Sequence, residues 1–155
     1  MPNTYTQIYI HFVFAVKYRH ALIGQEWREE VHKYITGIVQ NREHKLIAIN
    51  SMPDHMHVLI GLHANQSLSD LMRDVKAVSS KFINEKRWTR GRFSWQEGFG
   101  AFSYSHSQLD AVVQYIRNQE KHHRRRTFQE EYVEMLKKFH VDFRKEYVFQ
   151  PLKDE

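Results

Sequence analysis

The order of hydrophobic patterns along the chain constrains the fold more than any other feature of the sequence. In some segments apolar residues recur at every second position, as in strands, and in others at every third or fourth position, as in helices. The strand pattern covers 6–16, 45–52 and 55–62, and two shorter stretches at 93–97 and 101–105. The helical pattern covers about 25–43, 67–83, 107–125 and 127–139.

These segments follow one another as β-α-β-β-α-β, with a further strand and helix after them. This order predicts a single antiparallel sheet with helices packed on one face, which is the ferredoxin-like plan of the α+β class. Local signals support the boundaries. Pro53 and Asp54 suit a tight turn between two strands of a hairpin, and Ser67 with Asp70 three positions later is typical of a helix start.

The length of the chain suits one domain. A chain of 155 residues can bury about 70% of its unfolded surface in a single core. We expect one domain over 1–155, with a core at about 5–126 and a helical tail at about 127–155. The absence of cysteine excludes a disulfide scaffold, a thiolate nucleophile and a cysteine zinc site. The sequence shows no signal peptide and no apolar run near the roughly 20 residues of a membrane span, so we expect a soluble cytoplasmic protein without membrane contact.

Two histidines, His55 and His57, begin the strand expected at 55–62. Side chains two positions apart in a strand project from one face and can close on one ion or one phosphate. The apolar residues that alternate with them must face the helices, so the imidazoles are expected on the opposite face, outside the main core. Eleven histidines among 155 residues produce about one such pair by chance, so the spacing alone is a weak signal.

The helix expected at 107–125 carries a tyrosine near its buried stripe. At about 100° per residue, Tyr115 and Gln119 lie on one face at the edge of that stripe, and His122 falls beside them. A tyrosine in this position usually packs against the core with its hydroxyl in water. The helix alone therefore indicates no chemistry.

Five segments, taken together and in order, resemble the small single-tyrosine transposases of bacterial insertion sequences, the HUH (His-hydrophobic-His) or IS200-like class. They are HFVFAVKYR, MPDHMHVLI, LMRDVKAVSSK, FSWQEGFGAFSYS and YIRNQ. The resemblance covers nearly the whole chain and implies the fold of that class. It implies that His55, His57 and Gln119 are metal ligands and that Tyr115 is the nucleophile. It also implies cleavage and rejoining of single-stranded DNA at hairpin-bearing ends through a 5′-phosphotyrosine, by a homodimer with composite active sites.

The nature of the metal is less constrained by the residues themselves. Imidazole ligands favour zinc, copper or nickel, whereas the resemblance implies Mg²⁺ or Mn²⁺, with phosphate and water oxygens completing the shell. Asp54 is either a turn residue or a partner that orients an imidazole. His11, on the polar face of the first strand, either approaches the same site or is an ordinary histidine of the sheet.

A net charge of +5 is compatible with a polyanionic partner but does not identify one. The cations expected to contact DNA phosphates are Lys17, Arg19, Lys76, Arg124 and Arg125. Aromatic residues near them can stack on unpaired bases, namely Tyr18, Trp88, Trp95 and Phe99. Each cation can equally be an ordinary solvated surface group.

Three other functions remain open. The segment 97–104, EGFGAFSY, imitates the signature of an RRM module that binds single-stranded RNA. Its first position is acidic, however, and it follows the second helix, whereas the RRM signature lies on the strand before that helix. A second alternative is a metal-dependent nuclease that uses water as the nucleophile. A third is a domesticated relative that processes chromosomal repeats.

Overall fold

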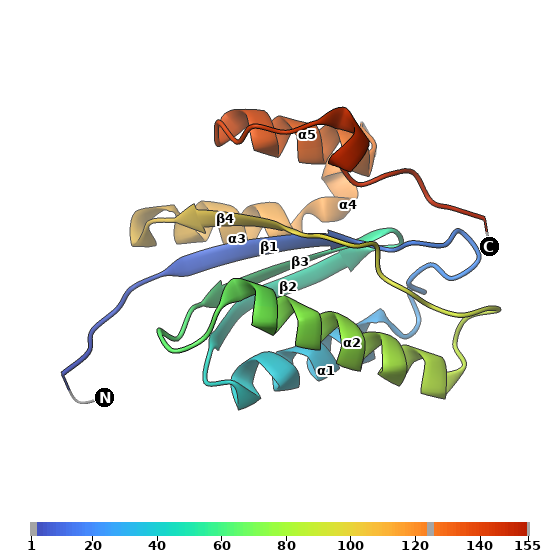
Figure 1. Ribbon diagram of the computed structural model, residues 1–155, viewed down its shortest axis with the longest axis horizontal. Helices are drawn as coiled ribbons and strands as arrows, with labels where there is room; N and C mark the ends of the chain where they lie inside the picture. The colour runs from blue at the N-terminus through green and yellow to red at the C-terminus, as the bar shows by residue number, and fades with distance from the viewer. Residues whose placement is uncertain (1–2, 124–125, 155) are drawn as a thin grey trace.

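The central element of the computed structural model, which describes residues 3–123 and 126–154, is a four-stranded antiparallel sheet (Figure 1). Its strands are β1 (Tyr9–Ala15), β2 (Lys45–Met52), β3 (His55–Gly61) and β4 (Gly100–Tyr104), in the order β2-β3-β1-β4. Every neighbouring pair is antiparallel, and β2 and β3 form the hairpin that turns at Pro53 and Asp54. The ferredoxin-like prediction is therefore confirmed.

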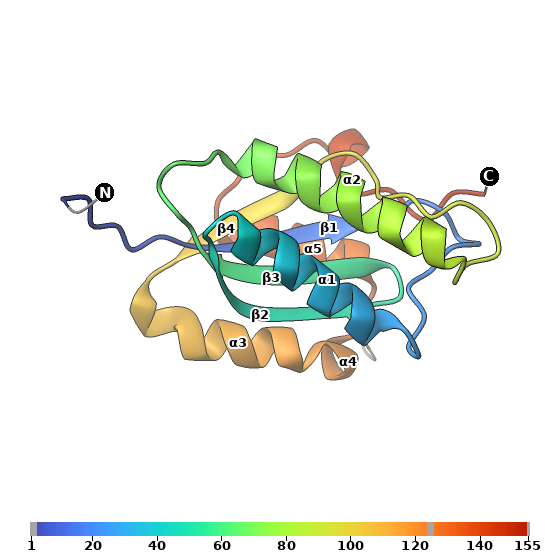
Figure 2. The same ribbon diagram turned by 90° about the horizontal axis from the view of Figure 1, so that it is seen from below.

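Two helices, α1 (Arg28–Asn41) and α2 (Leu68–Lys86), cover one face of this sheet (Figures 1 and 2). The main core lies between them and the sheet, where Phe12, Phe14 and Met56 pack against Ile35 and Leu71. Helix α2 begins as its sequence predicts, because the Ser67 side chain accepts a hydrogen bond from the amide of Asp70. No helix within residues 3–123 and 126–154 is long and apolar enough to cross a membrane.

The opposite face of the sheet is also covered. Helices α3 (Leu109–Arg117), α4 (Gln119–His122) and α5 (Phe128–Lys138) lie on this side, with α5 farthest from α1 and α2 (Figure 1). Val112 and Ile116 of α3 pack on Leu59 of β3. The helix expected at 127–139 thus forms a second layer over this face of the sheet, because its apolar stripe must be buried. This stripe consists of Phe128, Tyr132, Met135 and Leu136.

Two expected elements differ from the structure. The segment 93–97 is not a strand, and Trp95 forms only an isolated bridge with Val16. The helix expected over 107–125 begins with a 3-10 turn at His106–Gln108 and is then broken at Asn118, whose φ of −95° and ψ of 25° interrupt it. Hydrophobic periodicity does not report such a break, because it continues across one distorted residue.

Lys76 of α2 anchors the loop that leads into β4. Its ammonium donates hydrogen bonds to the backbone carbonyls of Gln96, at 2.9 Å, and of Gly98. Burial lowers the pKa of Lys76 to about 8. Its predicted contact with DNA remains a prediction, but two carbonyls of its own chain already occupy the ammonium.

We expect Lys76→Ala to lower the free energy of unfolding by about 1–3 kcal/mol, because it leaves two carbonyls without a donor. The matched control is Lys81→Ala on the same helix, where the side chain is 79% exposed and the change should be near zero. Urea unfolding of both variants measures the difference. Equal stability of the two would show that the anchor contributes nothing.

Candidate active site

The two histidines of β3 lie together on the face of the sheet opposite α1 and α2, and both are fully buried. His55 Nδ1 lies 2.7 Å from Asp54 Oδ1. Because a carboxylate only accepts hydrogen bonds, this contact places the proton on Nδ1 and leaves the lone pair on Nε2. Burial raises the pKa of Asp54, but the hydrogen bond from His55 outweighs this effect and holds the pKa of the carboxyl below its usual value. Asp54 thus both forms the turn and orients the imidazole.

His57 is supported in the same way by His11 of β1. His57 Nδ1 lies 2.8 Å from His11 Nε2, and both rings are fully buried. His11 is therefore part of the site rather than an isolated sheet histidine. His57 Nε2 is buried without a hydrogen-bond partner. Burial lowers the pKa of His57, which favours the neutral imidazole that binds metals.

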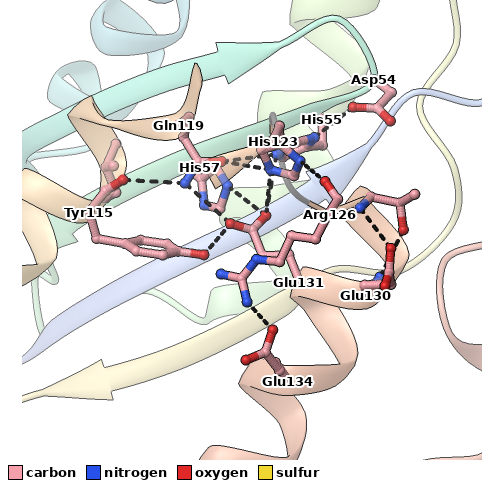
Figure 3. Close-up of polar contacts among 12 residues, drawn as sticks. Asp54, His55, His57, Tyr115, Gln119, His123, Arg126, Glu130, Glu131 and Glu134 are labelled. Atoms are coloured by element: carbon pink, nitrogen blue, oxygen red, sulfur yellow. Dashed lines mark hydrogen bonds and ion pairs between the residues drawn. The ribbon is translucent and has the colours of Figure 1, made fainter. Parts of the chain in front are cut away.

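Tyr115 and Gln119 come from the helical segment beside β2 and reach the same place (Figure 3). The Tyr115 ring lies 6.0 Å from the ring of His57, centroid to centroid. Gln119 is fully buried, and its Oε1 lies 3.2 Å from His55 Nε2. The structure thus brings together, in one chain, all four residues that the sequence predicts for catalysis and metal binding.

Glu131 of α5 stands at the centre of this group and was missed by the sequence analysis (Figure 3). It is fully buried. Its Oε1 lies 3.5 Å from Nε2 of His55 and 3.5 Å from Nε2 of His57, and its Oε2 accepts a hydrogen bond from the Tyr115 hydroxyl. A signal was present in the sequence, because Glu131 falls on the apolar stripe of α5, between Phe128 and Met135.

The charges of the site shift two pKa values strongly. Burial raises the pKa of Glu131, but the hydrogen bond from His123 and the closeness of His57 and His55 outweigh this effect and hold the carboxyl ionised, with its pKa far below the usual range. Burial and the adjacent Glu131 raise the pKa of Tyr115 well above its ordinary value. In this structure the tyrosine is therefore a neutral donor to a charged carboxylate.

His123 completes the ring of polar groups. Its Nε2 lies 3.0 Å from Glu131 Oε1 and 3.1 Å from Gln119 Oε1. From the helical spacing, His122 is expected beside Tyr115 and Gln119. The structure places His123 beside Gln119 and Glu131, because it follows Gln119 by four residues, which make about one helical turn. The side chain of His122 lies outside the described part of the chain.

The ligand atoms of His55, His57 and Glu131 all lie within 4.8 Å of one another, so this buried cluster can hold a metal ion. The donor set combines imidazole nitrogens with a carboxylate oxygen, and the amide oxygen of Gln119 borders it. Such a mixture suits divalent ions of the first transition row and, with further oxygen ligands, harder ions. The partnerless Nε2 of His57 supports this fit.

Of the cations predicted to contact DNA, two lie on a described segment beside the site and two lie outside the described residues. The amide of Val16 bonds the carbonyl of Asp54 at 2.9 Å, so the segment that carries Lys17 and Arg19 starts directly beside the site. The Arg19 guanidinium donates to the carbonyl of Leu152 at 3.2 Å. The other two predicted contacts, Arg124 and Arg125, lie outside the described residues.

A family model described as "Transposase IS200 like" matches residues 4–119. The ISDra2 transposase TnpA of Deinococcus radiodurans is 24% identical over 120 residues, which cover 73% of this chain and 84% of the relative. A crystal structure of a candidate transposase from the same organism superimposes with a TM-score of 0.60 at 22% identity, over 76% of this chain and 94% of the other. A REP-associated tyrosine transposase bound to a REP hairpin gives a TM-score of 0.60 at 17% identity, over 78% of this chain and 72% of the other.

Proposed function

Since this chain belongs to the family of IS200-like transposases, we propose that it cleaves and rejoins single-stranded DNA through a covalent bond between Tyr115 and a 5′-phosphate. The observation that carries the proposal is the position of the Tyr115 hydroxyl. It donates to one buried carboxylate, Glu131, whose other oxygen lies 3.5 Å from Nε2 of each strand histidine. A tyrosine that merely packed at the edge of the core would have no reason to face a cluster of metal-binding groups.

The proposed step exchanges one phosphodiester for another. The Tyr115 oxygen attacks phosphorus, the bond from phosphorus to the 3′-oxygen breaks, and the departing oxygen becomes a free 3′-hydroxyl. The phenol loses one proton and the leaving oxygen gains one. Glu131 Oε2 already accepts a hydrogen bond from that phenol. Because phenol, with a pKa near 10, is a better leaving group than an alcohol, another 3′-hydroxyl can reverse the step without ATP.

We propose that His55, His57 and Gln119 hold a divalent ion, Mg²⁺ or Mn²⁺, beside Tyr115. When bound, such an ion polarises the phosphate oxygens and stabilises charge on the departing 3′-oxygen. The chain supplies the orientation. Asp54 and His11 hold the two imidazoles so that each presents Nε2 to the centre.

The proposed substrate is single-stranded DNA whose ends carry hairpins. A structural relative is bound to a REP hairpin, which supports the proposal through the shared fold. Lys17 and Arg19 follow Val16, whose amide bonds the carbonyl of Asp54. They can therefore neutralise phosphates of a DNA strand that enters the site. Arg124 and Arg125 are proposed to do the same from the end of the tyrosine helix.

The direct test incubates the protein with labelled single-stranded DNA that carries candidate ends, in Mg²⁺ or Mn²⁺. We expect a labelled band that resists SDS and migrates as protein joined to DNA. Failure to detect any adduct across many sequences, with folded protein, would count against the proposal.

The predicted homodimer with composite sites can be tested by mixing two inactive variants, Tyr115→Phe and His57→Ala. Composite sites would combine the intact tyrosine of one subunit with the intact histidines of the other and restore cleavage. We propose such composite sites and therefore expect the mixture to regain cleavage. A mixture that stays inactive would show that Tyr115 acts within its own chain, where its ring lies 6.0 Å from that of His57.

A further inference from the structure

Glu131 lies in an environment that requires a positive partner. It is completely enclosed between α5 and the sheet. A buried carboxylate is costly unless it is paired or coordinates a metal. The only imidazole within ordinary hydrogen-bond distance, among the described residues, is His123 at 3.0 Å. The histidines of β3 face the same oxygen from farther away.

The distances to those two histidines match ligands of one ion better than hydrogen bonds. Glu131 Oε1 lies 3.5 Å from each Nε2, beyond the roughly 2.7–3.2 Å of a hydrogen bond. Two donors that share an ion at bond lengths of about 2.1 Å are separated by about 3.0 Å in octahedral and about 3.4 Å in tetrahedral geometry. The partnerless Nε2 of His57 points to the same conclusion.

Helix α5 positions Glu131 through its cap and its packing on the sheet. A capping box between Thr127 and Glu130 fixes its first turn. The ring of Phe128 stacks on His55, with centroids 4.1 Å apart and an angle of 11° between the planes. The match to the family model ends at residue 119, so this helix lies outside the matched segment.

We propose that Glu131 is a carboxylate ligand of the ion held by His55 and His57, so that the metal joins α5 to the sheet. The inference rests on the proposed function in requiring a divalent ion at the histidine pair. The carboxylate adds a hard, charged oxygen to two imidazoles, which strengthens the binding of Mn²⁺ and Mg²⁺. Its other oxygen contacts Tyr115, so the C-terminal helix links the ion to the nucleophile.

The test measures Mn²⁺ affinity of the full chain by titration calorimetry or electron paramagnetic resonance, without DNA. We expect Glu131→Gln to weaken binding by about 10- to 100-fold, and Glu131→Asp to weaken it less because it keeps the charge. The matched control is Glu134→Gln on the same helix, whose side chain is 66% exposed and should leave the affinity unchanged. Hydrogen exchange gives a second readout, since Mn²⁺ should slow exchange across α5 in the wild type and not in Glu131→Gln.

The possible results separate the inference from the function on which it rests. If Glu131→Gln binds Mn²⁺ as tightly as the wild type while His57→Ala does not, the carboxylate is not a ligand, and the histidine site remains. If the wild type binds no Mn²⁺, both the ligand role and the proposed metal are wrong. Thermal unfolding without metal shows whether Glu131→Gln is folded. If it is not folded, the Mn²⁺ affinities of Glu131→Asp and Glu134→Gln are compared in its place. Equal Mn²⁺ affinity of these two variants overturns the inference.

Discussion

Tyr115→Phe is expected to lose DNA cleavage by at least about 10⁴-fold and to form no covalent adduct. The substitution removes only the attacking oxygen, and the ring can keep its edge contact with His57. DNA binding and Mn²⁺ binding should therefore stay close to wild type. Single-turnover cleavage of a labelled strand measures the loss, and a gel-shift assay measures the binding.

The same variant distinguishes the competing functions. A nuclease that activates water would keep cutting without the phenol oxygen, and a module that only binds RNA would lose little affinity. Tyr104→Phe is the matched control, because Tyr104 also lies on this side of the sheet, 6.2 Å from His11 between ring centroids, and has no role in the proposed step. Equal loss in both variants would point to a general disturbance of the fold.

His57→Ala is expected to reduce cleavage by about 10³-fold or more, above the roughly 10- to 100-fold typical of residues that only orient a ligand. The change removes the Nε2 donor and leaves His11 without its partner. Mn²⁺ binding should be lost together with cleavage. Chelation of the wild type should have the same effect, and added Mn²⁺ should reverse it.

His63→Ala is the control for this second prediction. His63 follows β3 on the same hairpin, but its side chain is 39% exposed and lies outside the site. It should keep both Mn²⁺ binding and cleavage. Undiminished cleavage by His57→Ala, or by wild type after exhaustive chelation, would mean that the histidine pair has a purely structural role.

The sheet and its polar face were predictable because each depends on local alternation. Met56 and Val58 had to face the helices, which fixed the direction of His55 and His57 without knowledge of any other strand. The start of α2 was predictable because its cap at Ser67 also depends only on residues close in sequence. The pairing of these histidines with Tyr115 and Gln119 was implied only by the resemblance to a family.

The roles of Glu131 and His123 could not be predicted from local sequence patterns. Glu131 meets His57 across 74 positions, and only the folding of α5 over the sheet brings them together. His123 lies one helical turn after Gln119, beyond the break at Asn118, and contacts both Gln119 and Glu131. A single acidic residue on an apolar stripe indicates a buried partner but does not say which partner.

The proposed function requires that a phenol oxygen of this chain becomes joined to DNA. The most direct measurement digests the SDS-resistant product with protease and nuclease and identifies the modified peptide by mass spectrometry. We expect a nucleotide attached through its 5′-phosphate to Tyr115, formed only with a divalent ion. A nucleotide attached to another residue, or cut DNA that carries a free 5′-phosphate and no peptide, would contradict it.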